Sequence, residues 1–136
     1  MSKKKGTRAE RELLHMFYQA KWGVLRVAGS GSTTLPSPDL LAGNGTISLA
    51  IECKSIKSSS KYFPKEEIGQ LKLFSKMFGA MALIAIRFDN EGWYFIEPHK
   101  LKKTKSEYFV LNHDLACKKG LKFDGLVDKF KRVKVP

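Results

Sequence analysis

The sequence predicts an α/β fold in which a central mixed β-sheet is flanked by helices. Apolar residues recur at helical spacing over residues 8–22 and again over residues 64–78. Residues 80–88 are almost entirely apolar, as in a strand that is buried on both faces. Strand-like segments lie between and after the two helical ones, and this order is typical of a mixed sheet with helices on its faces.

Each element is expected from its own local signals. The first helix is indicated by Leu13, Leu14 and Phe17, which form one apolar stripe. The second begins at Pro64, which suits the first turn of a helix, and ends at Gly79. In chain order the sequence predicts a flexible basic arm (1–7), a helix (8–22), a strand (23–28), a flexible loop (29–37), two strands joined as a hairpin (38–42 and 46–54), a basic serine-rich loop (55–63), a helix (64–78), three strands (80–88, 93–97 and 107–111) and a helix (124–131).

The composition indicates one strongly basic domain. The chain has 136 residues, 43% of them hydrophobic, so residues 1–136 are expected to form a single domain with one core. Its 25 Lys and Arg against 13 Asp and Glu give a net charge of +12, which favours nucleic acid or, as the alternative, an anionic membrane surface. A signal peptide, a lipidation motif and an apolar run of about 18 residues are all missing, so we expect a cytoplasmic or nucleoid-associated protein.

The cysteines and histidines do not suggest a zinc site. Cys53 and Cys117 are far apart, and the three histidines do not stand at zinc-ligand spacing from them. Any metal should therefore be bound by oxygen.

The hairpin is expected to bring acidic and basic side chains together on one face. Side chains alternate along a strand, so Glu52 and Lys54 point together, away from the core. A two-residue turn at 44–45 places Asp39 opposite Ala50, on that same face, whereas a three-residue turn would reverse it. An exposed cross-strand ion pair is the plainer alternative for this Glu and Lys.

A third acid, Glu10, lies on the apolar stripe of the first helix. It is either a favourable charge near a helix N-terminus or a carboxylate held toward the sheet for a cation, and Asp39 and Glu52 favour the second interpretation. Carboxylates at short range raise one another's pKa unless a cation lies among them, and Mg²⁺, with Mn²⁺ as a possible substitute, prefers oxygen ligands. Lys54 would orient or activate a metal-bound water and offset charge on a phosphate, which indicates metal-assisted phosphodiester hydrolysis.

These motifs resemble a known nuclease superfamily. Pro38-Asp39 followed by Glu52-Cys53-Lys54 is similar to the PD-(D/E)xK pattern. A wider set of segments over roughly residues 3–100 resembles, in order and spacing, the archaeal Holliday-junction resolvases of the Hjc/Hje type: GTRAERELL (6–14), VLRVAGSG (24–31), PDLLAGNG (38–45), IECK (51–54) and GWYFIEP (92–98).

The resemblance implies a type II restriction-endonuclease-like core and a homodimer in which each subunit has one Mg²⁺-dependent site. The dimer would place paired nicks across a four-way DNA junction. By resemblance the catalytic residues are Glu10, Asp39, Glu52 and Lys54, with Ser30 as a small polar residue near the site and the backbone carbonyl of Cys53 as a metal ligand beside the three carboxylates. Arg11 and Arg26 match basic positions that are candidates for DNA contact.

The second predicted helix, 64–78, carries apolar residues on more than one side. Ile68, Leu71 and Phe78 lie along one face, and Leu73, Phe74 and Met77 lie beside it. One face can cover the sheet, so the other is expected to form a homodimer interface, with a deeply buried helix as the alternative. Four lysines are expected to line a joint DNA surface: Lys57, Lys61, Lys65 and Lys72.

The sequence therefore predicts a Mg²⁺-dependent endodeoxyribonuclease that resolves four-way junctions in DNA recombination and repair. Two alternatives stay open, a non-catalytic basic protein that binds and bends DNA and another PD-(D/E)xK repair or restriction nuclease. Only a nuclease explains three acids and a lysine on one surface, and the absence of an extra recognition domain in 136 residues argues against a sequence-specific restriction or repair nuclease.

Overall fold

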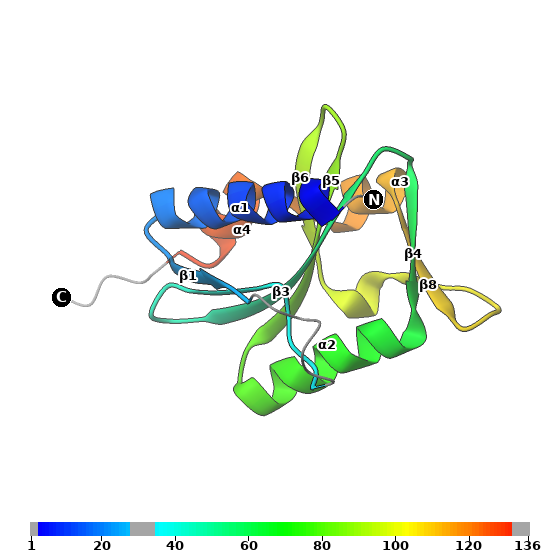
Figure 1. Cartoon of the computed structure of the whole chain (residues 1–136), viewed down its shortest axis with the longest axis horizontal. Helices are drawn as coiled ribbons and strands as arrows, with labels where there is room; N and C mark the ends of the chain where they lie inside the picture. The colour runs from blue at the N-terminus through cyan, green and yellow to red at the C-terminus, as the bar shows by residue number, and fades with distance from the viewer. Residues whose placement is uncertain (1–2, 28–34, 132–136) are drawn as a thin grey trace.

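Two sheets and four α-helices make up the structure, a computed structural model that describes residues 3–27 and 35–131 (Figure 1). The elements are α1 (Lys3–Gln19), β1 (Gly23–Arg26), β2 (Leu40–Gly43), β3 (Ser48–Ile56), β4 (Ser60–Pro64), α2 (Lys65–Phe78), β5 (Met81–Phe88), β6 (Gly92–Ile96), a short 3₁₀ helix η2 (Pro98–Lys100), β7 (Lys102–Lys103), β8 (Tyr108–Asn112), α3 (His113–Lys119), β9 (Leu121–Lys122) and α4 (Phe123–Lys129). None of the helices described is long and apolar enough to cross a membrane.

The main sheet has six strands in the order β1-β2-β3-β5-β6-β9, and β4, β8 and β7 form a second sheet. In the main sheet β3 and β5 pair in parallel and the other neighbours pair antiparallel. The predicted mixed sheet flanked by helices is therefore confirmed.

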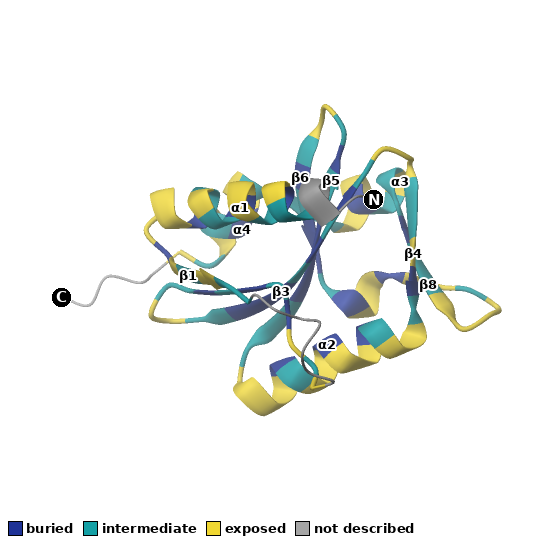
Figure 2. Ribbon diagram, viewed as in Figure 1, coloured by how far each residue is buried: buried dark blue, intermediate teal, exposed yellow. Residues whose placement is uncertain are grey.

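The main sheet separates two hydrophobic cores (Figure 2). On one face Ile51 of β3 packs with Leu13 and Phe17 of α1. On the other face Ala50 packs with Ile68 of α2 and with the second sheet. Each large apolar side chain that is fully buried in this way contributes about 1.5–3 kcal/mol. The alternation of β3 thus decides which of its side chains meets which helix.

Helix α1 begins earlier than the sequence suggests. Residues 3–7 are helical, so the expected flexible arm is wrong for this segment. The segment contains three lysines and no proline, and the helix formers that follow it, Arg8, Ala9 and Glu10, continue α1 through Gly6 and Thr7. The predicted stripe is confirmed, because Leu13 and Phe17 are fully buried. The helix ends at Gln19, and Lys21 then adopts a left-handed conformation with φ of 70°.

The β2–β3 hairpin turns one residue later than expected. The side-chain oxygen of Asn44 accepts the N–H groups of Thr46 and Ile47, each at 2.9 Å, and Gly45 has a φ of 90°. Asn44 therefore precedes the turn, and the two residues at its tip are Gly45 and Thr46.

This turn shifts the strand register by two residues. Leu40 pairs with Ile51, so the expected pairing of Asp39 with Ala50 is wrong. A shift of two residues keeps every paired side chain of β2 on its expected face, because the period of a strand is two. Asp39 lies in a bend just before β2, and its main-chain N–H donates at 3.0 Å to the carbonyl of Ile51, the residue that pairs with Leu40.

Residues 55–63 are not the single loop that the sequence predicts. β3 continues to Ile56, and Ser60–Pro64 forms β4, which pairs with β8. Phe63 is fully buried and lies opposite Phe109, a residue far away in sequence. Pairing and burial from a distant segment thus override the polar local sequence.

Candidate active site

Strand β3 directs Glu52 and Lys54 toward the first turn of α2. The ammonium Nζ of Lys54 lies 2.8 Å from Oε1 of Glu67 and 3.5 Å from Oε2 of Glu52. All three side chains are half-buried. Glu67 thus joins the predicted residues Glu52 and Lys54 in one cluster of alternating charge.

Asp39 is held at the edge where β2 begins. Its Oδ2 accepts the main-chain N–H of Cys53 at 2.8 Å, and its carbonyl accepts the N–H of Val27 at 2.9 Å. Pro38 before it is buried, so the chain enters this position along a fixed path. Within a strand the N–H and C=O of one residue point to the same side, so the carbonyl of Cys53 faces the edge at which Asp39 lies.

The fold raises the pKa of the carboxyl groups of Asp39 and Glu52 above their ordinary values. Burial, and then the charge of Glu10, raise the pKa of Asp39 to about 6 against the opposing effect of the Cys53 hydrogen bond. Burial, the charge of Asp39 and the hydrogen bond to Glu67 raise the pKa of Glu52 to about 9. Burial also raises the pKa of the Cys53 thiol, which therefore stays neutral. The pair thus carries an electrostatic cost that a bound cation would relieve.

Lys54 and Glu67 favour their charged forms instead. Burial acts against charge at both, but their mutual hydrogen bond outweighs it, so the pKa of Lys54 is raised and that of Glu67 is lowered. Lys54 is therefore an ammonium ion at neutral pH. In this state it can offset negative charge or orient a water molecule, but it cannot accept a proton.

Glu10 approaches Asp39 from the other side of the sheet. A carboxylate of α1 that joins Glu52 on its own face would need α1 to cover that face, but α1 packs on the opposite face of the sheet, so this direct approach does not occur. The carboxylate of Glu10 accepts Nε of Arg26 at 2.8 Å and is still close enough to raise the pKa of Asp39. Glu10 thus belongs to the neighbourhood of the site, although Arg26 already occupies one of its oxygens.

The predicted DNA-binding residues do not form one patch. Arg11 and Lys57 are exposed, and Lys61 is half-buried and lowers the pKa of Glu67. Lys65 lies 2.8 Å from Glu107, and Lys72 lies over the ring of Phe109 at 5.9 Å. Ser30, with most of the predicted loop 29–37, lies outside the described residues.

A divalent ion fits the oxygen donors of this site, provided that a backbone carbonyl and oxygens of water or substrate add to the side-chain ligands. Within residues 3–27 and 35–131, no three His, Cys, Asp or Glu side chains are gathered so that they could hold an ion by themselves. The fit therefore depends on the carboxylates of Asp39 and Glu52 and on the carbonyl of Cys53. These are the oxygen ligands that Mg²⁺ accepts, and it ordinarily keeps waters and takes phosphate oxygens as well.

Glu67 is the member of the cluster that the sequence analysis missed. By sequence alone Glu67 is an acid in the first turn of a helix, where a negative charge is favourable. A better signal was its spacing, because Glu67 lies one turn before Leu71, which is buried. An acid beside the buried stripe of a helix that covers β3 is placed to meet the polar residues of that strand.

The chain resembles proteins of one family along its whole length. Residues 1–135 match the family model described as archaeal Holliday junction resolvase (Hjc). The crossover junction endodeoxyribonuclease Hjc of Archaeoglobus fulgidus is 41% identical over 108 residues, 79% of either chain, and that of Methanocaldococcus jannaschii is 35% identical over 107 residues, 79% of this chain and 76% of the relative. The solved structure of Archaeoglobus fulgidus Hjc, a Holliday junction resolvase, matches with a TM-score of 0.83 and 36% identity over 89% of this chain and 98% of that one.

Proposed function

The chain belongs to the archaeal Holliday junction resolvase (Hjc) family, and we propose that it cuts four-way DNA junctions at a site formed by Asp39, Glu52 and Lys54. The observation that carries this site is a pair of half-buried carboxylates of raised pKa beside an ammonium group that a further acid holds at 2.8 Å. A protein that only binds and bends DNA gains nothing from such an arrangement, since acids whose pKa is raised by the fold cost stability when they are ionised.

Asp39, Glu52 and the backbone carbonyl of Cys53 are the proposed ligands of Mg²⁺, with Mn²⁺ as a substitute. Such an ion supplies positive charge for the phosphate under attack and lowers the pKa of the attacking water. Glu10 adds negative charge beside Asp39, and Arg26 fixes its position.

Lys54 brings its positive charge to the scissile phosphate. Because its pKa is raised, it stays protonated throughout and stabilises the charge that develops as water attacks. Glu67 holds the ammonium group at 2.8 Å and acts as a positioning residue.

The remaining proposed DNA contacts come from the basic surface. Arg11 and Lys57 are exposed and available for phosphate, whereas Arg26 and Lys65 would have to exchange an ion pair for one. Lys61 lies on β4 just before α2, Lys72 lies on α2, and Ser30 is proposed as a small polar residue near the scissile strand. The protein is proposed to act on chromosomal DNA, which suits its net charge of +12.

The proposed activity is tested by comparing the rates at which the protein cuts a four-way junction and a linear duplex of matching sequence. In Mg²⁺ the protein is expected to cut a synthetic immobile four-way junction at a rate at least about a hundredfold above that for a linear duplex of the same arm sequence, about 2.7 kcal/mol of discrimination. The cuts are mapped on denaturing gels. Binding of the junction without cleavage in either Mg²⁺ or Mn²⁺ would leave only an architectural role.

The proposed homodimer uses the side of α2 that faces away from the sheet. Leu73 is 51% exposed, Met77 78% and Phe78 55%, while Ile68 and Leu71 are buried in the core. Phe78, predicted on the same face as Ile68 and Leu71, is not buried with them, and its ring stacks on Phe74 at 5.4 Å. An apolar strip of this kind is typical of an interface, and a two-fold dimer suits a junction of matching symmetry.

Charge placed on this strip is expected to break the dimer. The double variant Met77→Glu, Phe78→Glu should sediment as a monomer where the wild type is a dimer, because two like charges would be buried in each half of the interface. The variant should nick junctions singly instead of in pairs. Tyr18→Glu is the matched control, since Tyr18 is 72% exposed on α1, across the sheet from α2. A monomeric wild type, or a double variant that remains dimeric, would contradict the interface.

A further inference from the structure

The second sheet carries exposed aromatic and basic side chains that the proposed active site does not use. Tyr62 on β4 is 57% exposed and Tyr108 on β8 is 45% exposed. Tyr62 pairs with Val110, which in turn pairs with Lys102 of β7, so these three side chains form one row across the sheet. Tyr108 lies two residues before Val110 and shares its face. These four residues, Tyr62, Lys102, Tyr108 and Val110, are called the tyrosine face below.

The opposite face of the same sheet is anchored in the protein core. Phe63 and Leu111 are fully buried, in a cluster that includes Ile68 of α2 and Ile86 of β5. The second sheet therefore cannot turn its tyrosine face inward. Figure 1 shows β4 and β8 side by side at the edge of the molecule, with β4 leading into α2, the helix that carries Glu67.

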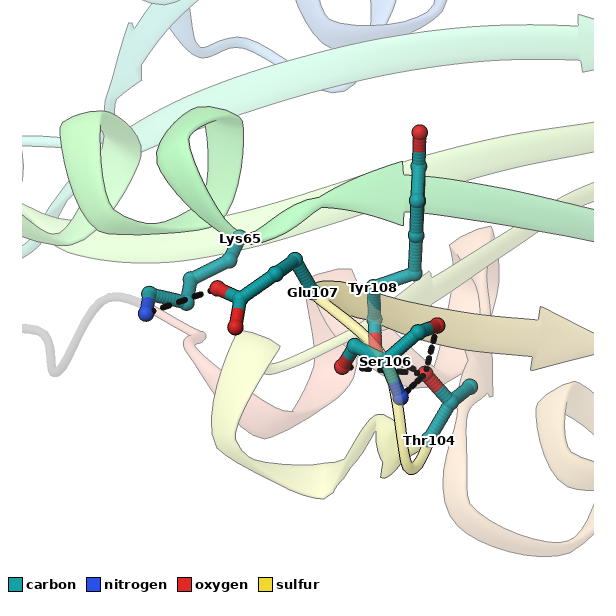
Figure 3. A network of polar contacts seen from close by, with 5 residues as sticks. All are labelled: Lys65, Thr104, Ser106, Glu107 and Tyr108. Carbon is teal, nitrogen blue, oxygen red and sulfur yellow. Dashed lines mark hydrogen bonds and ion pairs between the residues drawn. The ribbon is translucent and has the colours of Figure 1, made fainter.

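A network of polar contacts holds the end of β8 that carries Tyr108 (Figure 3). The hydroxyl of Thr104 donates to the carbonyl of Tyr108 at 2.8 Å and accepts the N–H of Ser106 at 3.2 Å. Glu107 accepts the ammonium of Lys65 at 2.8 Å, and its carbonyl accepts the Lys65 N–H at 3.0 Å. In Figure 3 the ring of Tyr108 points away from these contacts, so the backbone beneath it is fixed while the ring is open.

The rings of Tyr62 and Tyr108 have no aromatic partner in the described part of the chain, and their hydroxyls have no hydrogen-bond partner there. They occupy diagonal positions on neighbouring strands, with Cβ atoms roughly 7–8 Å apart. Flat aromatic rings presented on a sheet are platforms on which nucleobases stack, and nearby lysines attract the phosphates between them. Such a surface takes bases only where they are not paired and stacked within a duplex.

We propose that the tyrosine face binds exposed nucleobases of DNA, with Tyr62 and Tyr108 stacking on bases and Lys102 contacting a phosphate. The proposal rests on the proposed function and names a second DNA-contacting surface of that enzyme. Nucleic acid is favoured over a second copy of the chain, because the exposed Lys102 lies on this face and a further exposed lysine, Lys105, lies in the turn between β7 and β8. A symmetric contact would bring these lysines together without compensation.

Binding of single-stranded DNA without cleavage tests the proposal. The probe is a fluorescein-labelled oligothymidine of about 16 nucleotides, titrated in EDTA and followed by anisotropy. The double variant Tyr62→Ala, Tyr108→Ala is expected to bind at least about tenfold more weakly than wild type, since two stacked bases together are worth more than this factor. The double variant Tyr62→Phe, Tyr108→Phe keeps the rings and should bind within about twofold of wild type. Lys102→Ala should reduce the salt slope of binding by about 0.7, the value for one phosphate of a single strand.

Tyr18→Ala is the control for loss of an exposed tyrosine elsewhere, and thermal melting confirms that each variant is folded. Wild-type affinity in the double alanine variant would overturn the proposal, as would equal losses in the alanine and phenylalanine pairs. A change of sedimentation confined to the alanine pair would identify a protein contact and would also overturn it. Junction cleavage at saturating protein separates this result from the proposed function, because the alanine pair should still cut whenever the wild type does.

Discussion

Replacement of Asp39 by alanine is expected to abolish junction cleavage in Mg²⁺ while the junction still binds within about threefold of wild type. The change removes one of the two carboxylates that face the proposed ion and the acceptor of the Cys53 N–H. Loss of a ligand that helps to stabilise a phosphoryl transition state costs several kcal/mol, a rate reduction of about a thousandfold or more. Binding is preserved because it depends on phosphate contacts spread over a basic surface.

The variant Asp39→Asn is the matched control for this result. Its side-chain oxygen can still accept the Cys53 N–H, so the strand edge is retained while the negative charge is lost. Cleavage should fall as far as in the alanine variant, and both losses are measured in single-turnover assays with mobility shifts in EDTA alongside. An alanine variant that cuts at the wild-type rate would show that Asp39 is not part of the active site.

Glu52→Gln is expected to abolish cleavage and to make the metal-free protein more stable at pH 8. The pKa of Glu52 is about 9 in the fold against an ordinary value of 4.5, so the fold favours the protonated side chain. Its contribution to stability is complete below about pH 4.5 and is lost as the pH rises toward 9. Glutamine is neutral at every pH, so the variant should melt at least about 3 °C higher than wild type at pH 8 in EDTA, with the two curves converging near pH 5.

Mg²⁺ should reverse this order of stability. The wild type binds the ion and is stabilised by mass action, whereas the variant lacks one ligand and gains little. Glu66→Gln is the control, because Glu66 is an exposed neighbour of Glu67 in the first turn of α2. Calorimetric melts at pH 5 and pH 8, with and without Mg²⁺, provide the measurement. If Glu52→Gln is destabilised in EDTA at pH 8, the assigned protonation of the site is wrong.

The residues on strong local patterns could be predicted from the sequence. Alternation along β3 places Glu52 and Lys54 on one face whatever the neighbouring strand does. The apolar stripe of α1 is likewise visible as Leu13 and Phe17 at helical spacing. These two features define the central strand and one of the helices that cover it. The family resemblance indicates which reaction the site would catalyse, the hydrolysis of phosphodiester bonds in DNA junctions.

The remainder depends on contacts between distant segments. The hairpin register was set by the side chain of Asn44, which caps the turn and moves it by one residue. The pairing of β4 with β8 and the meeting of Glu67 with Lys54 join segments with no common local pattern. The side of the sheet on which α1 packs places Glu10 across from Glu52, and no periodicity within α1 could reveal it.

A divalent ion is proposed to bind between Asp39 and Glu52, and the position of Mn²⁺ in a crystal of this protein tests this directly. Anomalous scattering measured near the Mn absorption edge locates the ion without reference to activity. We predict a peak within coordination distance of the Asp39 and Glu52 carboxylates and of the Cys53 carbonyl. If Mn²⁺ lies elsewhere and not at this position under conditions that support cleavage, then Asp39 and Glu52 do not hold the ion.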